Sequence, residues 1–294
     1  MISRSPNRNL RVACEFSAER VLVARAADSG ELIEACAMQS LAGGSIVPSL
    51  TAANVGNAAG VRDALRNALA TAGSRSRDVI VVIPDAACRV ALLDFDTLPN
   101  KAHEAEGVVR FRLKKSLPFD VDRARVSYQV QRENGKLSVI AAVALTSVVE
   151  EYESLLRDAG YNPGMVLPSM LAALGQVDAS RPTLVIKVDA RSISLAIVDR
   201  DQLLLTRTLE NSAGSKVDGE QLAEDAYPSL VFFQDTYGMK IDTVLVGGLA
   251  SLDKLSFALQ GMRVQELVSA SRLPAAAPGG SRPFLGGVVG ALVS

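Results

Sequence analysis

Histidine is almost absent from this sequence, since His103 is the only one among 294 residues. Metal sites that pair two imidazoles and catalytic triads built on a histidine base are therefore nearly excluded. We predict no metal-binding residue and no catalytic residue, and we expect His103 to lie at the start of a helix.

Cysteine is scarce as well. Cys14, Cys36 and Cys88 lie far apart, each within an apolar or alternating stretch. An odd number of cysteines without a framework spacing is typical of reduced thiols in a cytosolic protein. We therefore predict three buried thiols that pack as small hydrophobic side chains.

The sequence has no excess of either charge and no long hydrophobic run. With 31 basic and 32 acidic residues, its net charge is -1, whereas a nucleic-acid-binding domain usually carries a clear basic excess. No run reaches the ~18 apolar residues that a membrane span needs. The N-terminus also lacks the apolar core of a signal peptide. We expect a cytoplasmic protein that binds no nucleic acid and touches a membrane only peripherally.

The length exceeds what one hydrophobic core usually serves, so two lobes are expected. Two parts of the chain each open with three short alternating segments followed by a helix. In the first part, strands are predicted at 11–16, 21–27, 31–37 and 79–83, with a helix on Val61, Leu65 and Leu69. In the second part, strands are predicted at 183–189, 192–198, 202–209 and 242–246, and helices at 218–237, kinked at Pro228, 251–259 and 286–293.

A β-α-β-β unit interrupts the first part. It comprises strand 89–95, a helix at about 101–116, and strands 125–132 and 137–145, which Asn134 and Gly135 join as a hairpin. A helix at 147–159, a turn at Asn162-Pro163, a short helix at 169–174 and a linker at 179–182 follow. We predict a first lobe at 1–181 with an inserted subdomain at 85–146, and a second lobe at 182–294.

Several short segments, in one order along the chain, carry a resemblance to known proteins. They are Ile83-Pro84, 94–99, Glu104, 117–120, 127–130, 158–163, 246–249 and 283–288. With the duplicated lobes, they resemble the actin-like ATPase superfamily, and the insertion resembles the PilM family of type IV pilus assembly. The resemblance implies an α/β, actin-like (ribonuclease H-like) two-lobed fold with a β-α-β-β insertion in the first lobe.

In that superfamily two hairpin turns hold the nucleotide phosphates, and a Gly-Gly turn contacts the adenosine. Glycine lets backbone N–H groups approach a phosphate closely, but the turns at 15–19 and 187–192 contain none. Lys187 stands where an aspartate is expected, and a carboxylate such as Glu15 within ~4 Å of a phosphate would cost ~4 kcal/mol per charge pair. We expect no cofactor and no enzymatic activity. If Mg-ATP does bind, the resemblance assigns it to Ser17, Asp189, Ala190, Gly247 and Gly248.

The resemblance also implies a scaffold. PilM proteins bind the N-terminal tail of PilN, a single-span membrane protein, and connect it to the pilus motor ATPases or platform proteins. The implied tail-binding residues are Phe95, Leu98, Arg112, Leu117, Pro118 and Phe119. The alternative is that these apolar residues fill the insertion's own core, and for Phe95 and Leu98 we favour that interpretation.

The basic residues Arg110, Arg112, Lys114 and Lys115 have two interpretations. They suit the end of a helix, or they contact an acidic partner or anionic lipid. The rival functions are an active actin-like ATPase and a cytoplasmic scaffold of a type II secretion system. Self-association is not decided by the sequence.

Overall fold

The computed structural model describes residues 10–30, 32–73, 76–133, 136–214, 217–275 and 277–293.

The first sheet begins with the three-stranded meander. Strands β1 (Val12–Phe16), β2 (Arg20–Ala26) and β3 (Ile33–Ser40) pair antiparallel, while β4 (Asp78–Ile83) lies parallel to β1 and β8 (Asn162–Pro168) parallel to β4. The strand order is β3-β2-β1-β4-β8. The meander and the parallel strand at 79–83 are thus confirmed.

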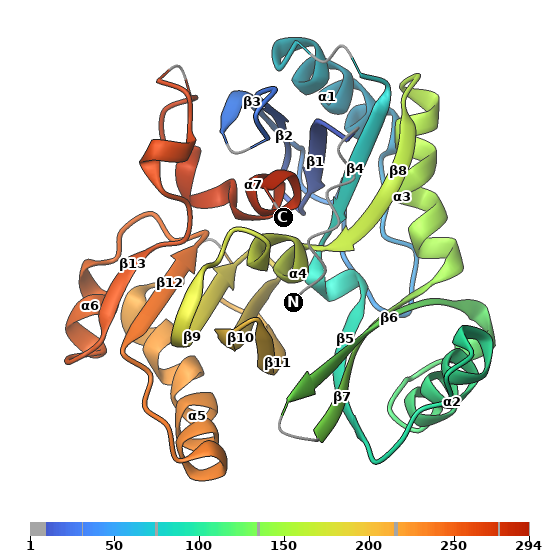
Figure 1. Cartoon of the computed structure of the whole chain (residues 1–294). Helices are drawn as coiled ribbons and strands as arrows, with labels where there is room; N and C mark the ends of the chain where they lie inside the picture. The colour runs from blue at the N-terminus through green and yellow to red at the C-terminus, as the bar shows by residue number, and fades with distance from the viewer. Residues whose placement is uncertain are drawn as a thin grey trace.

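Helices cover both faces of this sheet (Figure 1). Because side chains alternate along a strand, Val12, Cys14 and Phe16 face the core formed with helices α1 (Ala58–Thr71) and α3 (Thr146–Asp158). Ala13 faces the opposite side and packs against helix α7 (Gly286–Val293). All three cysteines are free and buried, as predicted.

The second sheet repeats this plan. Strands β9 (Ala179–Val188), β10 (Ser192–Arg200) and β11 (Gln202–Glu210) form the meander, and β12 (Thr243–Gly247) and β13 (Arg263–Glu266) extend it in parallel, in the order β11-β10-β9-β12-β13. Helices α5 (Gly219–Tyr237, with Pro228 inside it) and α6 (Asp253–Ala258) share one core with this sheet. Helix α4 (Ser169–Leu174) packs against its other face.

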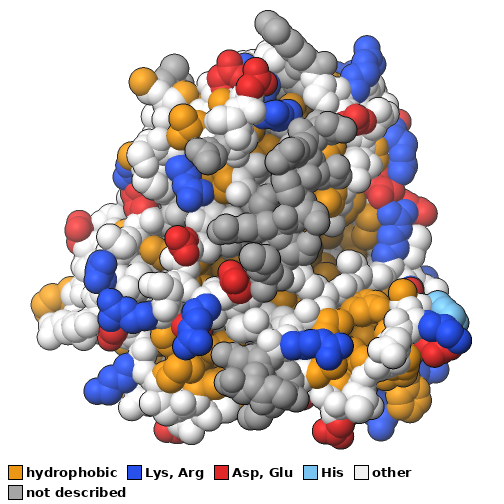
Figure 2. All heavy atoms as spheres, viewed as in Figure 1, with side chains coloured by type: hydrophobic (Ala, Val, Ile, Leu, Met, Phe, Trp, Pro, Cys, Tyr) orange, Lys and Arg blue, Asp and Glu red, His pale blue; other side chains and the backbone are white. Residues whose placement is uncertain are grey.

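The inserted subdomain has its own sheet, in the order β5-β7-β6. It consists of β5 (Arg89–Phe95), α2 (Ala102–Lys114), β6 (Ala124–Glu133) and β7 (Lys136–Leu145). One face of the sheet packs on α2, and the other reaches the second lobe through Ile140. Figure 2 shows hydrophobic side chains over this subdomain, at the lower right. The predicted β-α-β-β unit is present, and its turn at 134–135 lies outside the described residues.

Three details differ from the sequence-based prediction. The predicted turn at Asn162-Pro163 is the beginning of β8, an edge strand, where a proline without an N–H is tolerated. The predicted linker at 179–182 is the first part of β9, and Ala179 pairs with Arg200 beyond an irregularity in the register. Strand β13 has no counterpart among the predicted elements, because Val264 is its single apolar residue.

Helix α7 crosses from the second lobe to the first. It contacts β1, β2 and β4 of the first sheet and lies against α4. A Cβ on Gly290 would overlap the carbonyl oxygen of Ala172 in α4, so this close contact requires glycine. The residues at 182–294, predicted as the second lobe, therefore include a helix that packs in the first.

Candidate functional site

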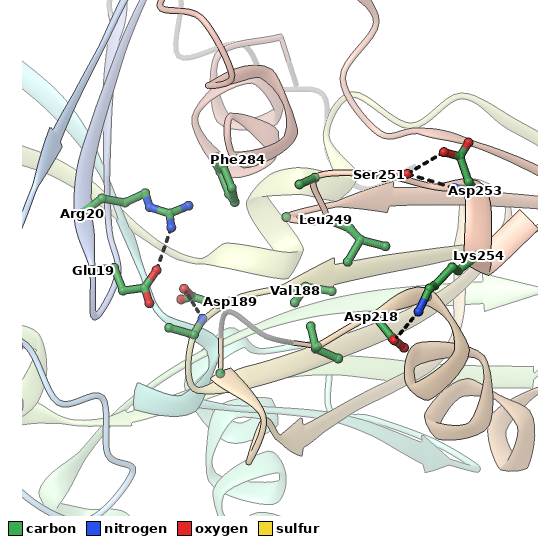
Figure 3. A pocket seen from close by; sticks show the side chains of 16 residues that line it. Glu19, Arg20, Val188, Asp189, Asp218, Leu249, Ser251, Asp253, Lys254 and Phe284 are labelled. Carbon is green, nitrogen blue, oxygen red and sulfur yellow. Dashed lines mark hydrogen bonds and ion pairs between the residues drawn. The ribbon is translucent and has the colours of Figure 1, made fainter.

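A cavity of about 450 Å³ lies in the cleft between the two lobes (Figure 3). This volume falls within the usual range for small-molecule sites. The turn after β1, the turn after β9, the segment after β12 and the first residues of α5 and α6 surround it. The cavity is lined by Glu19, Arg20, Val188, Asp189, Ala190, Gly214, Val217, Asp218, Gly219, Gly248, Leu249, Ala250, Ser251, Asp253, Lys254 and Phe284.

The turn between β1 and β2 uses its polar groups internally. The Ser17 N–H donates to the carbonyl of Arg20 at 3.0 Å. The Ser17 hydroxyl accepts the N–H groups of Glu19 at 3.4 Å and Arg20 at 3.2 Å. Ser17, a predicted nucleotide contact, thus turns its hydroxyl toward its own backbone.

The polar groups of the turn between β9 and β10 also form hydrogen bonds within the protein. The Asp189 N–H donates to the carbonyl of Ser192 at 2.8 Å, and its carboxylate accepts the Ala190 N–H at 2.7 Å. Asn211 donates to the Asp189 carbonyl at 2.7 Å. Asp189 and Ala190 line the cavity as predicted, but their N–H groups already have protein acceptors.

The two predicted glycines differ in their surroundings. Gly247 ends β12 and does not line the cavity, whereas Gly248 does. Gly248 has φ +88°, and a Cβ there would overlap the carbonyl of Val188, so only glycine fits. Its N–H donates to the carbonyl of Pro283 at 2.6 Å.

A buried ion pair lies between the two turns. Nζ of Lys187 is 2.7 Å from Oε1 of Glu15, and both side chains are almost fully buried. The Ser169 hydroxyl donates to the same Glu15 oxygen at 2.5 Å. Although burial by itself lowers the pKa of Lys187, the carboxylates of Glu15, Asp189 and Asp85 hold it above its usual value. The lysine is therefore charged at neutral pH.

The Glu15–Lys187 pair leaves little empty space around it. The remaining void, which Glu15, Ser17, Lys187 and Asp189 help to line, measures about 20 Å³. That is close to the space needed by a single water molecule. A Cβ on Gly287 of α7 would overlap the Glu15 carboxylate, so the backbone of α7 packs directly against this side chain.

A second buried carboxylate joins the lobes nearby. Asp85 accepts the Met170 N–H at 2.8 Å and the hydroxyl of Ser194, from β10, at 2.8 Å. Burial raises the pKa of Asp85, while the Lys187 charge and the two hydrogen bonds oppose that rise. No local pattern in the sequence marks this residue, because its partners lie 85 and 109 positions away.

Acidic residues outnumber basic ones around the cavity (Figure 3). Arg20 pairs with Glu19 at 2.7 Å and lies over the ring of Phe284 at 3.8 Å. Lys254 pairs with Asp218 at 2.9 Å. Asp189 and Asp253 remain as additional carboxylates, and burial raises the pKa of Asp189. A polyanionic ligand would meet repulsion here. Within the described part of the chain, no three His, Cys, Asp or Glu side chains gather as a metal site would require.

The predicted tail-binding residues lie together on the inserted subdomain. Phe95, Leu98 and Leu117 are half-buried and pack against its core, so Phe95 and Leu98 do belong to that core. Phe119 packs against both this core and that of the first lobe, at their junction. Pro118 is exposed.

The four basic residues at the C-terminal end of α2 differ in their contacts. Arg110 pairs with Glu106 at 2.8 Å and donates to the carbonyl of Val121 at 3.0 Å, so it has a structural role. The exposed Arg112 lies 5.8 Å from the ring of Phe95, among the predicted tail-binding residues. Lys114 and Lys115 are exposed at the end of the helix.

Comparison with known proteins was made by sequence and by structure. No family model and no curated protein matches the sequence. The PilM-PilN type IV pilus biogenesis complex contains a chain that matches with a TM-score of 0.77 at 18% identity, over 97% of this chain and 99% of that one. The cytoplasmic domain of EpsL, an inner membrane component of the type II secretion system of Vibrio cholerae, matches with a TM-score of 0.56 at 11% identity, over 89% and 91%. The ethanolamine utilization protein EutJ from Carboxydothermus hydrogenoformans matches at 0.51 and 12% identity, over 96% and 89%.

These matches identify the fold. None of the helices in the described residues is long and apolar enough to cross a membrane. The predicted fold class is confirmed, and the chain has the two-lobed actin-like fold, in the form seen in the PilM-PilN complex along nearly its whole length.

Proposed function

We propose that this protein is a cytoplasmic scaffold of a type IV pilus assembly complex, which binds the N-terminal tail of a PilN-like membrane protein. The observation that carries the proposal is the match to the PilM-PilN complex over 97% of this chain, since that coverage includes the inserted subdomain. The protein acts at the inner face of the membrane, through its partner.

The nucleotide site is degenerate in this proposal. Supporting it, the N–H groups of Ser17, Asp189 and Gly248 all have protein acceptors. The Glu15–Lys187 pair occupies part of the space beside the turns and leaves a void of about 20 Å³ around it. Phosphate binding in such a site depends on free N–H groups, so we expect neither ATP binding nor hydrolysis. These contacts argue against the rival function of an active ATPase.

The tail binds beside the junction of the inserted subdomain and the first lobe. Phe119 contacts both cores there, and Arg112 and Pro118 are exposed next to it. An extended tail gains affinity from backbone hydrogen bonds and specificity from side-chain pockets. The type II secretion scaffold remains the second candidate, because the EpsL domain matches over 89% of the chain.

Co-purification with the membrane partner tests the proposal. Arg112→Glu should weaken capture of a PilN-like protein, because the exposed guanidinium would be replaced by an opposite charge. Arg181→Glu is the matched control, since Arg181 is 74% exposed and belongs to β9 of the second sheet, not to the inserted subdomain. If neither Arg112→Glu nor deletion of the partner's tail reduces capture, the proposed function is wrong.

A further inference from the structure

Exposed aromatic side chains gather on a few surface helices. Among the described residues these are Phe111 on α2, Tyr227, Phe232 and Tyr237 on α5, and Phe257 on α6. Phe111 is 67% exposed and Phe232 56%, although most phenylalanines pack inside proteins. Exposed rings on the outer face of a helix are candidates for contact with a partner, and the charges around them indicate of what kind.

The outer face of α2 is basic around Phe111. Lys114 and Lys115 follow Phe111 by three and four residues, so they lie beside it on the helix surface. Gly107 precedes it by four residues, and a Cβ there would meet nothing within 4 Å. Packing within the chain therefore does not require this glycine, and there is open space beside it.

The outer face of α5 is acidic around its aromatic residues. The helix contains Glu220, Glu224, Asp225 and Asp235 and no lysine or arginine. Two rows with a spacing of four run along it. They are Glu224, Pro228 and Phe232, and Tyr227, Val231 and Asp235, all exposed. Pro228 has no N–H, so the Glu224 carbonyl lacks its helical donor and adds an acceptor among the carboxylates.

The two faces are complementary in charge and both offer aromatic contact. In Figure 1, α2 lies at the right side of the molecule and α5 at the lower left, so they cannot meet within one chain. We propose that α2 of one copy docks on α5 of a second copy, with Lys114 and Lys115 facing Glu224 and Asp235. The two contact surfaces differ, so the association is head to tail and extends beyond a dimer.

This contact uses a different part of α2 from the proposed tail site. Arg112 lies over Phe95 beside the insertion's core, whereas Phe111 is exposed one residue earlier, about 100° around the helix. Lys115 follows Arg112 by three residues, so it lies between the two surfaces. The self-association is argued from the charges and exposed rings of α2 and α5 and does not rest on the proposed function.

Charge reversal on each face tests the proposal. One variant of the full chain carries Lys114→Glu and Lys115→Glu, and the other carries Glu224→Lys and Asp235→Lys. A matched control carries Arg123→Glu and Arg132→Glu, two exposed positions of the same subdomain outside α2. Sedimentation velocity at low and high salt gives the association state, and thermal melting verifies that each variant is folded.

The wild type should associate with rising concentration at low salt, and less at high salt, because salt screens exposed charges. Each reversed variant should lose about tenfold or more in association constant, and the control should not. An equimolar mixture of the two reversed variants should associate again. The unchanged α2 face of one variant meets the unchanged α5 face of the other, and the two reversed faces are also opposite in charge. A wild type that stays monomeric at all concentrations, or a mixture that fails to associate when both variants are folded, overturns the proposal.

Discussion

Lys187 and Glu15 form an ion pair that joins the two lobes, with Nζ of the lysine 2.7 Å from Oε1 of the glutamate. Lys187 belongs to β9 of the second sheet, and Glu15 to β1 of the first. Both side chains are buried, so removal of one partner would leave an uncompensated charge away from water. The pair thus links the two lobes through a buried contact.

Lys187→Met should destabilise the protein by about 3–5 kcal/mol, as expected when one member of a buried pair is removed. The double variant Glu15→Gln/Lys187→Met should recover most of that loss, because the introduced amide would keep the hydrogen bond from Ser169 without a buried charge. Urea unfolding measures both free energies.

Lys254→Met serves as the control for this experiment. Lys254 is 59% exposed in its pair with Asp218, and exposed pairs contribute about 0–1 kcal/mol. If Lys187→Met changes stability no more than Lys254→Met does, the Glu15–Lys187 pair does not hold the lobes together.

Mg-ATP should not stabilise the wild-type protein. Ligand at about 100 times its dissociation constant adds ~2.7 kcal/mol to the free energy of unfolding, which a melting experiment detects easily. The expected result is an unchanged Tm at millimolar Mg-ATP, because the N–H groups of Ser17, Asp189 and Gly248 already have protein acceptors. A saturable rise in Tm would show that the site still binds nucleotide.

Asp85→Asn tests the pKa of a buried carboxyl. The pKa of Asp85 is raised in the folded protein by burial, so the folded state holds this proton more tightly than the unfolded chain does. Ionised Asp85 therefore costs stability, and this cost appears as pH rises from the unfolded value of 3.8 through the folded pKa. An asparagine amide can accept from the Met170 N–H and donate to the Ser194 hydroxyl, without the charge.

The Asp85→Asn variant should accordingly match or exceed the wild type in stability at pH 7, and any advantage should shrink below the unfolded pKa. Urea unfolding at a series of pH values measures this. A variant that is less stable than wild type at pH 7 by as much as at acid pH would contradict the stated direction of the pKa.

Gly290→Ala should destabilise the protein by about 1–3 kcal/mol, because a methyl group would force α7 away from α4. Gly107→Ala is the matched control, since its methyl group would meet nothing. That variant should gain about 0.5–1 kcal/mol from helix propensity. Equal effects of the two substitutions would mean that α7 is not docked as described.

The local parts of the fold could be predicted from the sequence because alternation and helical spacing report burial directly. The meanders, α1 on Val61 and Leu65, and the inserted subdomain are examples. Strand β8 could not be predicted, because a proline such as Pro163 is compatible both with a turn and with an edge strand. The short β13 offers too few apolar positions for a period to show.

The site depends on contacts that no local pattern reports. The sequence marks Glu15 and Lys187 separately as departures from a nucleotide-binding turn. Their ion pair spans 172 positions and exists because α7 and the two sheets bring the strands together. The hydrogen bond from the Gly248 N–H to the Pro283 carbonyl likewise joins residues that are distant in the sequence.

Titration of the full chain with a peptide of the PilN-like tail, with and without Mg-ATP, tests the central claim most directly. A nucleotide-independent scaffold predicts saturable binding with the same Kd in both conditions, weakened by Arg112→Glu and unchanged by Arg181→Glu. Absence of binding to the wild type, or binding that requires Mg-ATP, would contradict it.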